Sequence, residues 1–289
     1  MWRWLRRAVL LYAVIPYGSV VLIFTVFQRQ LMYRPVVAYD LRIRNADLRA
    51  TSGEDLKLTT TDGITICGWL LRCHRDDDAS HHLPRLVLYF PGNAGNRSDR
   101  LPDLREFTAS GFDVLIFDYR GFGDSAGAPS EASLIDDAHL IWHYACHDLG
   151  YAEQRIVIFG ESLGGAVALS LWDGAETWAS EQSPKPAALI LNSTFASMPQ
   201  TVAWHYPWFP FRYLLFDHWS SINRIPSVTV PVVVFHGTDD EFIPLQQGRE
   251  LAAAGQAAQM IEIPGGTHNS IPMAQLRTEL ESIASRLDE

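Results

Sequence analysis

IVIFGESLGGAVALSL, residues 156–171, is the stretch of sequence that decides the fold. Its first four residues are β-branched or aromatic, which is typical of a strand buried on both faces. A glycine-rich turn follows, and the alanine- and leucine-rich residues after it favour a helix. The stretch therefore predicts a buried strand that passes through a tight turn directly into a helix.

The turn holds a serine between two glycines, in the order Gly160-x-Ser162-x-Gly164. Between a strand and a helix this is the pattern of a nucleophile elbow, in which a strained backbone projects the serine hydroxyl above the sheet. Glycines two residues to either side let the strand and the helix pass without a Cβ clash. The motif string alone is weak, so it is the strand–turn–helix context that predicts Ser162 as a nucleophile.

On both sides of the elbow, short apolar runs alternate with longer helical stretches. Such runs are typical of strands buried on both faces, and the helical segments between them imply a parallel sheet with right-handed crossovers. We therefore predict an α/β fold with a mostly parallel, doubly wound sheet. The expected strands are residues 86–90, 114–117, 156–159, 189–191, 232–235 and 260–263. Residues 56–60 and 64–71 flank Asp62-Gly63 and predict an antiparallel hairpin ahead of this sheet.

Candidate partners for the serine follow the last two strands. A serine hydroxyl needs a base within hydrogen-bond reach, and His268 lies on a glycine-rich loop after residues 260–263. An acid to orient that base would come from Asp239 or Asp240, directly after residues 232–235. Chemistry in such sheets gathers at the carboxyl ends of the strands, and the chain order serine, aspartate, histidine fits this fold.

Two backbone amides are candidates for binding a developing oxyanion. One belongs to Leu163, just after the serine, and we assign the other to Asn93, in the loop after residues 86–90. That loop is glycine-rich, but it has no G-K-[ST] ending and no dinucleotide fingerprint, which argues against a phosphate cradle.

These segments together resemble the membrane-anchored α/β-hydrolase domain proteins, a group that includes protein depalmitoylases, lysophospholipases and other esterases. The matching pieces are the elbow and residues 90–96 (FPGNAGN), 118–125 (DYRGFGDS), 236–244 (HGTDDEFIP) and 266–268 (GTH). The resemblance implies an α/β-hydrolase fold and favours Asp240 as the acid, three residues before Ile243. One departure is Pro91, where many relatives have histidine. Arg120 and Asp124 are expected to hold loops together rather than to contact substrate.

The first 34 residues form a separate predicted unit, a membrane anchor ahead of an α/β-hydrolase domain at 35–289. Residues 8–27 carry no charge and, as a helix, would span about 30 Å, the thickness of a bilayer's hydrocarbon core. The run is long for a cleaved signal peptide and lacks small residues at its end, although a buried or interfacial helix is an alternative. Arginines flank it on both sides, so the expectation that the catalytic domain lies outside the cytoplasm rests only on the closely packed arginines before the span. A chain truncated before Arg34 is expected to be soluble and active.

Residues 198–225 carry eight aromatic side chains and two prolines that break a long helix. They predict a small cap inserted above the sheet, whose rings would wall an apolar acyl site. The alternative is an ordinary amphipathic helix on the flank of the domain.

Composition limits the partners and cofactors. A net charge of −10 and the lack of a basic stripe in the soluble part argue against nucleic acid. Neither a metal nor a cofactor is expected: the acidic and histidine-containing loop at 74–84 fits no defined metal site, and His139, His143 and His147 are read as an exposed helix face. The three cysteines form no disulfide framework, although a bridge between Cys67 and Cys73 is left open.

The sequence therefore predicts a serine esterase or thioesterase that acts on small-molecule, lipid-like or acylated substrates from a membrane-tethered position. A peptidase with the same three residues is an alternative, as is a membrane-tethered scaffold without turnover. The oligomeric state is left open.

Overall fold

An eight-stranded sheet forms the centre of the molecule in a computed structural model that describes residues 1–43, 52–74, 83–173, 185–270 and 273–288. The strand order is β10-β9-β8-β7-β4-β6-β3-β2. Only β3 runs against its neighbours, pairing antiparallel with both β2 and β6, while the other described pairs in this sheet are parallel. The predicted mostly parallel α/β sheet is confirmed.

The strands agree closely with the apolar runs of the sequence. β4 and β6 to β9 are buried along almost their whole length, as expected for strands covered on both faces. The predicted hairpin is β2 and β3, joined at a turn in which Gly63 has a φ of +81°. The strands of the main sheet are β2 (Ser52–Thr59), β3 (Thr65–Arg72), β4 (Leu86–Phe90), β6 (Asp113–Phe117), β7 (Ile156–Glu161), β8 (Ala188–Asn192), β9 (Val232–Gly237) and β10 (Ala258–Ile263).

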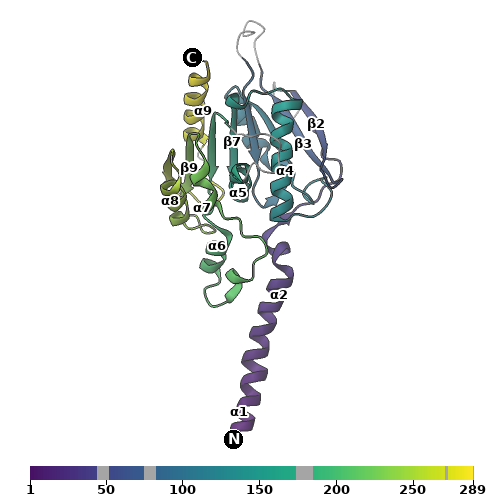
Figure 1. Ribbon diagram of the computed structural model, residues 1–289, viewed down its shortest axis with the longest axis vertical. Helices are drawn as coiled ribbons and strands as arrows, with labels where there is room; N and C mark the ends of the chain where they lie inside the picture. Colours follow the sequence, from purple (N-terminus) through teal and green to yellow (C-terminus); the bar gives the residue numbers. More distant parts are fainter. Residues whose placement is uncertain (44–51, 75–82, 174–184, 271–272, 289) are drawn as a thin grey trace.

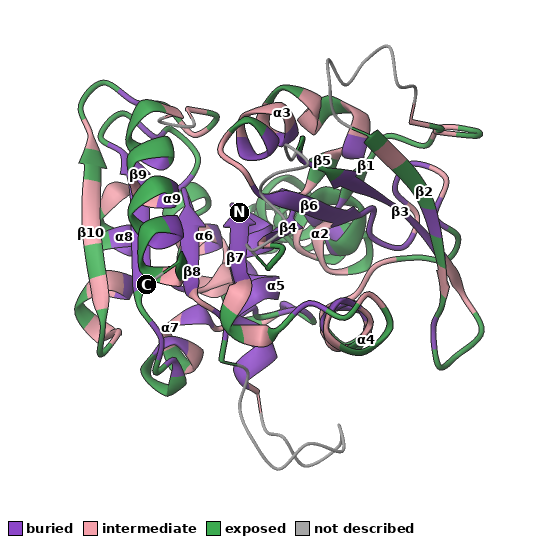
Figure 2. Cartoon of the chain, turned by 90° about the horizontal axis from the view of Figure 1, so that it is seen from above, coloured by how far each residue is buried: buried purple, intermediate pink, exposed green. Residues whose placement is uncertain are grey.

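Helices cover both faces of the sheet and divide the core in two. On one face, α3 and α9 bury leucines and Phe107 against the sheet. On the other face, α4, α5 and α8 bury leucines of their own. Figure 2 shows the buried strands between these two helical layers. The helices are α3 (Leu101–Ala109), α4 (Glu131–His143), α5 (Leu163–Leu169), α6 (Met198–His205), α7 (Ser221–Arg224), α8 (Leu245–Ala254) and α9 (Met273–Asp288).

A long N-terminal helix projects from one end of the domain, opposite the C-terminus (Figure 1). It consists of α1 (Trp2–Val9), a π-helical turn (Leu10–Val14) and α2 (Ile15–Met32). Pro16 has no N–H to donate to the preceding turn, which accounts for the widened turn just before it. The 31-residue helix is long and apolar enough to cross a membrane, although an N-terminal signal sequence can have the same properties.

The cap segment, residues 198–225, lies beside α2 at the end of the domain from which the helix projects (Figure 1). It consists of α6, a 3-10 turn at Pro210–Tyr213 and α7. The Phe24 and Phe211 rings stack at 3.7 Å between centroids, and the Arg29 guanidinium binds Asp217 at 3.0 Å. Residues 198–225 therefore pack on the N-terminal helix as well as on the domain.

The three cysteines are free. Cys67 lies within β3 and Cys73 just after its last residue. The two are six residue steps apart along an extended strand, about 20 Å, which is too far for a disulfide. Most of the loop at 74–84 lies outside the described residues, so its predicted solvated character stays a prediction.

Candidate active site

Ser162 stands at the tight turn between β7 and α5. Its φ of 52° is a strained conformation for a residue other than glycine. The flanking glycines are needed for close contact: a Cβ on Gly164 would lie 1.9 Å from the Phe90 carbonyl oxygen, and one on Gly160 2.5 Å from the Gly165 Cα. The expected elbow geometry is therefore present.

The structure brings the serine, histidine and aspartate side chains together from three separate loops. His268 Nε2 lies 3.1 Å from Ser162 Oγ, and His268 Nδ1 lies 2.9 Å from Asp240 Oδ2. The Asp239 side chain is exposed and accepts a hydrogen bond from the Thr238 hydroxyl at 3.1 Å. A chain of hydrogen bonds thus runs from Asp240 through the imidazole to the serine hydroxyl.

Asp240 is held as an anion in a closed environment. Burial alone would raise its pKa, but hydrogen bonds from His236, His268 and the Ile243 N–H outweigh burial and bring the pKa well below its usual value. Asp240 Oδ1 accepts from the amides of Phe242 at 2.9 Å and Ile243 at 2.8 Å. The carboxylate therefore stays charged beside the imidazole.

His236 is a supporting residue that the sequence analysis did not single out. It is fully buried, and its Nε2 lies 2.9 Å from the Ile243 carbonyl oxygen and 3.3 Å from Asp240 Oδ2. A carbonyl oxygen only accepts hydrogen bonds, so Nε2 carries the proton. Its position at the end of a predicted strand, four residues before Asp240, was the available signal.

The two residues with candidate oxyanion amides, Asn93 and Leu163, line the same cavity as the serine. Leu163 is the first residue of α5, where an amide has no intrahelical acceptor. Asn93 lines the same cavity as Ser162 and His268. Its side-chain amide donates to the Met32 carbonyl at 2.8 Å, and its own carbonyl accepts from the Arg34 N–H at 2.9 Å. The loop at 91–96 is thus bonded to the end of the N-terminal helix.

Glu161, the residue before the serine, ties the elbow to the same loop. Its carboxylate accepts from Arg100 Nε at 2.7 Å and from the Tyr89 hydroxyl at 3.0 Å. Arg100 also donates to the Ala94 carbonyl at 3.3 Å. A partly buried ion pair therefore fixes the distance between the elbow and the loop.

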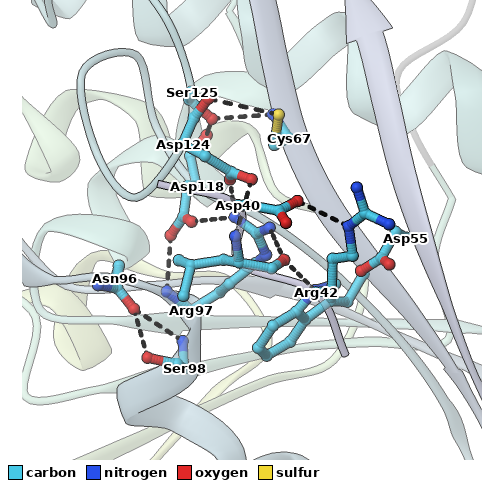
Figure 3. A network of polar contacts seen from close by, with 12 residues as sticks. Asp40, Arg42, Asp55, Cys67, Asn96, Arg97, Ser98, Asp118, Asp124 and Ser125 are labelled. Atoms are coloured by element: carbon cyan, nitrogen blue, oxygen red, sulfur yellow. Dashed lines mark hydrogen bonds and ion pairs between the residues drawn. The ribbon is translucent and has the colours of Figure 1, made fainter. Parts of the chain in front are cut away.

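Arg97 fixes the other end of this loop, within the polar network in Figure 3. Its buried guanidinium binds Asp118 and, at 2.6 Å, Asp124, and it lies over the Trp69 ring. Arg120 binds both oxygens of Asp137 at 2.7 Å. The expectation that Arg120 and Asp124 hold loops together is confirmed.

A cavity of about 480 Å³ opens beside Ser162. One wall comes from the domain around the serine, a second from the cap segment and a third from α2. The cap contributes Met198, Thr201, Val202, His205, Tyr206 and Leu215, and α2 contributes Phe24, Gln28, Leu31 and Met32.

These walls bear on two sequence-based expectations. Of the eight aromatic residues in the cap segment, Tyr206 alone is among the described lining residues, because the others pack on α2, lie in the core or face outward. The N-terminal helix was expected to be dispensable for activity. Its side chains form part of the cavity wall, so we predict instead that removing it opens the cavity.

The histidines at 139, 143 and 147 lie away from this cavity. His143 and His147 are exposed and their rings are 4.3 Å apart, while burial lowers the pKa of half-buried His139. Among the described parts of the chain, no three or more histidine, cysteine or acidic side chains gather as metal ligands would.

Comparisons with known proteins agree with this fold. A family model described as "Serine aminopeptidase, S33" matches residues 85–220. An uncharacterized protein of Mycobacterium tuberculosis is 37% identical over 263 residues, which cover 91% of this chain and 88% of the relative. Protein bem46 of Schizosaccharomyces pombe is 33% identical over 67% of this chain and 62% of its own length. The α/β-hydrolase domain-containing protein WAV2 of Arabidopsis thaliana is 28% identical over 86% of this chain and 83% of its own.

Solved structures of similar shape include esterases. An esterase of Pyrococcus furiosus has a TM-score of 0.63 at 17% identity, covering 89% of this chain and 98% of the esterase. A cold-adapted esterase from an Arctic intertidal metagenomic library has a TM-score of 0.58 at 18% identity, covering 85% and 98% of the two chains. At these identities the likeness establishes the fold.

Proposed function

Because the chain belongs to the α/β-hydrolase family, we propose that it is a serine hydrolase that cleaves carboxylic ester or thioester bonds through an acyl-enzyme. The observation that carries the proposal is the hydrogen-bonded series Asp240, His268 and Ser162, with distances of 2.9 and 3.1 Å. A scaffold without turnover has no need of this alignment on a strained serine.

In the proposed reaction, His268 Nε2 takes the proton of Ser162 Oγ as the oxygen attacks the acyl carbon. Asp240 stabilises the imidazolium that forms and keeps Nδ1 protonated. The Asn93 and Leu163 amides bind the oxyanion. His268 then gives its proton to the leaving alcohol or thiol, and a water activated by the same imidazole releases the acid.

The cavity favours an acyl chain over a peptide's free amino terminus. Its described lining is mostly apolar and contains no aspartate or glutamate that could bind an ammonium group. An aminopeptidase needs such a group to recognise its substrate, so the lining supports a lipid-like or otherwise acylated ester or thioester. The esterases among the structural neighbours are consistent with this preference.

We further propose that the N-terminal helix is retained as a single-pass membrane anchor, with the hydrolase domain at 35–289 and its cap at 198–225 outside the cytoplasm. A signal sequence is cleaved off, so the folded domain would not depend on contacts with it. Here, instead, the last two turns of α2 bond to buried groups: Gln28 is 2% exposed, and Arg29 binds Asp217. Protease accessibility in intact cells and spheroplasts would test this orientation.

A substrate series tests the proposed activity. We expect kcat/KM on p-nitrophenyl esters to rise from acetate into medium chains, by at most about 0.8 kcal/mol per buried methylene, and then to level off. An acyl thioester should also be cleaved, whereas an amino-acid p-nitroanilide should not, and Ser162→Ala should be inactive on all of them. A profile that declines from acetate onward would contradict the lipid-like preference, and preferential cleavage of the anilide would favour a peptidase.

A further inference from the structure

The cap segment touches α2 deep within its charge-free run. The Tyr17 and Phe209 rings stack at 5.2 Å between centroids, and the Tyr17 hydroxyl donates to the Trp208 carbonyl at 3.2 Å. Tyr17 lies ten residues before Phe27, the last residue of that run, which is about 15 Å along a helix. If the charge-free run lies in a bilayer, this edge of the cap lies in it too.

Polar side chains of α2 bind backbone groups of the cap. Besides the Tyr17 bond, the buried Gln28 amide donates to the Leu214 carbonyl at 3.0 Å, and its oxygen accepts from the Phe216 N–H at 2.6 Å. Backbone groups in hydrocarbon need protein partners because no water is available. These contacts are therefore suited to an irregular segment immersed in lipid beside a helix.

The outer surface of the cap is rich in aromatic rings. Trp208 is 86% exposed and Tyr213 72%, and Trp204 and Phe216 are also more than half exposed. Tryptophan and tyrosine concentrate at membrane interfaces. Although the chain carries a net charge of −10, residues 1–39 contain five arginines and no acidic residue, which favours anionic headgroups. The aromatic surface and the charge distribution both match a lipid surface.

We infer that the cap segment dips into the bilayer leaflet beside α2, and that a bilayer-resident, long-chain acyl ester passes its acyl chain from that leaflet between α2 and α6 into the catalytic cavity. The two elements that would contact the leaflet are also two walls of the cavity, through Phe24 and Leu31 on α2 and Val202 and Tyr206 of the cap. This inference rests on the proposed hydrolase function. The acyl group moves from the lipid oxygen to Ser162 Oγ, the alcohol leaves with the serine proton, and water then releases the fatty acid.

The depth of the cap can be measured without any assay of activity. Trp208→Cys in the full-length chain would carry an environment-sensitive fluorophore, in vesicles of phosphatidylcholine and phosphatidylglycerol with or without a lipid-borne quencher. Ser282→Cys, exposed on α9 at the opposite end of the domain, is the matched control. We expect blue-shifted, quenched emission at position 208 only. Identical, water-like emission at both positions would overturn the inference.

An activity measurement then tests the route of the substrate. Trp208→Ser combined with Tyr213→Ser alters exposed rings that do not line the cavity. We expect about a tenfold loss of hydrolysis of a long-chain acyl lipid in vesicles, with p-nitrophenyl acetate hydrolysis in detergent unchanged. Unchanged lipid hydrolysis would overturn the inferred route. Wild-type protein that cleaves neither substrate would refute the proposed function, while the fluorescence result would still decide the position of the cap.

Discussion

Replacing Asp240 by asparagine tests how this residue acts on His268, because one carboxylate oxygen becomes an amide nitrogen and little else changes. The asparagine carbonyl can keep the two bonds that Oδ1 accepts from the Phe242 and Ile243 amides at 2.9 and 2.8 Å. Its NH₂ group then stands where Oδ2 lies, 2.9 Å from His268 Nδ1. An amide nitrogen only donates, so the hydrogen bond to the imidazole is reversed.

The reversal moves the imidazole proton to the wrong nitrogen. Nδ1 must now accept, so the proton sits on Nε2, which faces Ser162 Oγ at 3.1 Å and can no longer take the serine proton. We expect kcat to fall by about 10⁴-fold, equivalent to about 5.5 kcal/mol of activation free energy. Asp240 is not among the described residues of the cavity wall, so KM should change little.

Asp239→Asn is the matched control, because Asp239 is the adjacent residue and its side chain is exposed. Its kcat should stay within about twofold of wild type, as expected for a surface change away from the site. Steady-state hydrolysis of a p-nitrophenyl ester measures both variants, and thermal unfolding checks that both are folded. The reverse ranking would transfer the role to Asp239, and equal, small losses would refute the reasoning about the tautomer.

Two further predictions concern the N-terminal helix and the surroundings of the elbow. A chain that begins at Arg34 lacks the helix wall of the cavity and both side chains bonded to buried Asp217, so we expect about a tenfold or greater loss of kcat/KM and about 3 to 5 kcal/mol of stability. A chain that begins at Ser19 keeps these contacts, and its kcat/KM should stay within about threefold of the full-length value. Equal activity of the two truncated chains would contradict the role given to the helix. Burial and then repulsion from Glu161 raise the pKa of Asp103 to about 6, so the folded state holds an extra proton between roughly pH 4 and 6 and stability falls as the pH rises through that window. After allowance for solvent screening, Asp103→Asn should therefore raise Tm by about 2 to 4 °C at pH 8 and hardly at all at pH 4. A gain in Tm confined to acid pH would contradict this reasoning.

The sheet could be predicted from the sequence because its signals are local. Each buried strand is a continuous apolar run, and β4 begins and ends where that run does. The elbow is equally local, since the glycines at 160 and 164 are required by contacts within one turn and with the neighbouring strand. Ser162, His268 and an acid at 239 or 240 follow because the carboxyl ends of parallel strands meet at one edge, and the family resemblance favoured Asp240.

The packing of the N-terminal helix could not be predicted in this way. The bonds from Arg29 and Tyr33 to Asp217 join residues more than 180 positions apart, and no local pattern pairs them. An apolar, charge-free run is the same signal whether a helix only anchors the chain or also forms a cavity wall. The aromatic rings of the cap were misplaced for a similar reason: composition indicates that rings gather there, but not which way they point.

Covalent labelling tests the central claim, that Ser162 is the nucleophile of a working hydrolase, most directly. The full-length chain in detergent would be treated with a fluorophosphonate probe and the modified peptide identified by mass spectrometry, with Ser162→Ala and Ser193→Ala treated in parallel. Ser193 is a suitable control because it is another buried serine with a positive φ, at 49°. We predict one modification, on Ser162, retained in Ser193→Ala and lost together with ester hydrolysis in Ser162→Ala. Full labelling of Ser162→Ala, or an unlabelled wild-type protein that still cleaves esters, would contradict the claim.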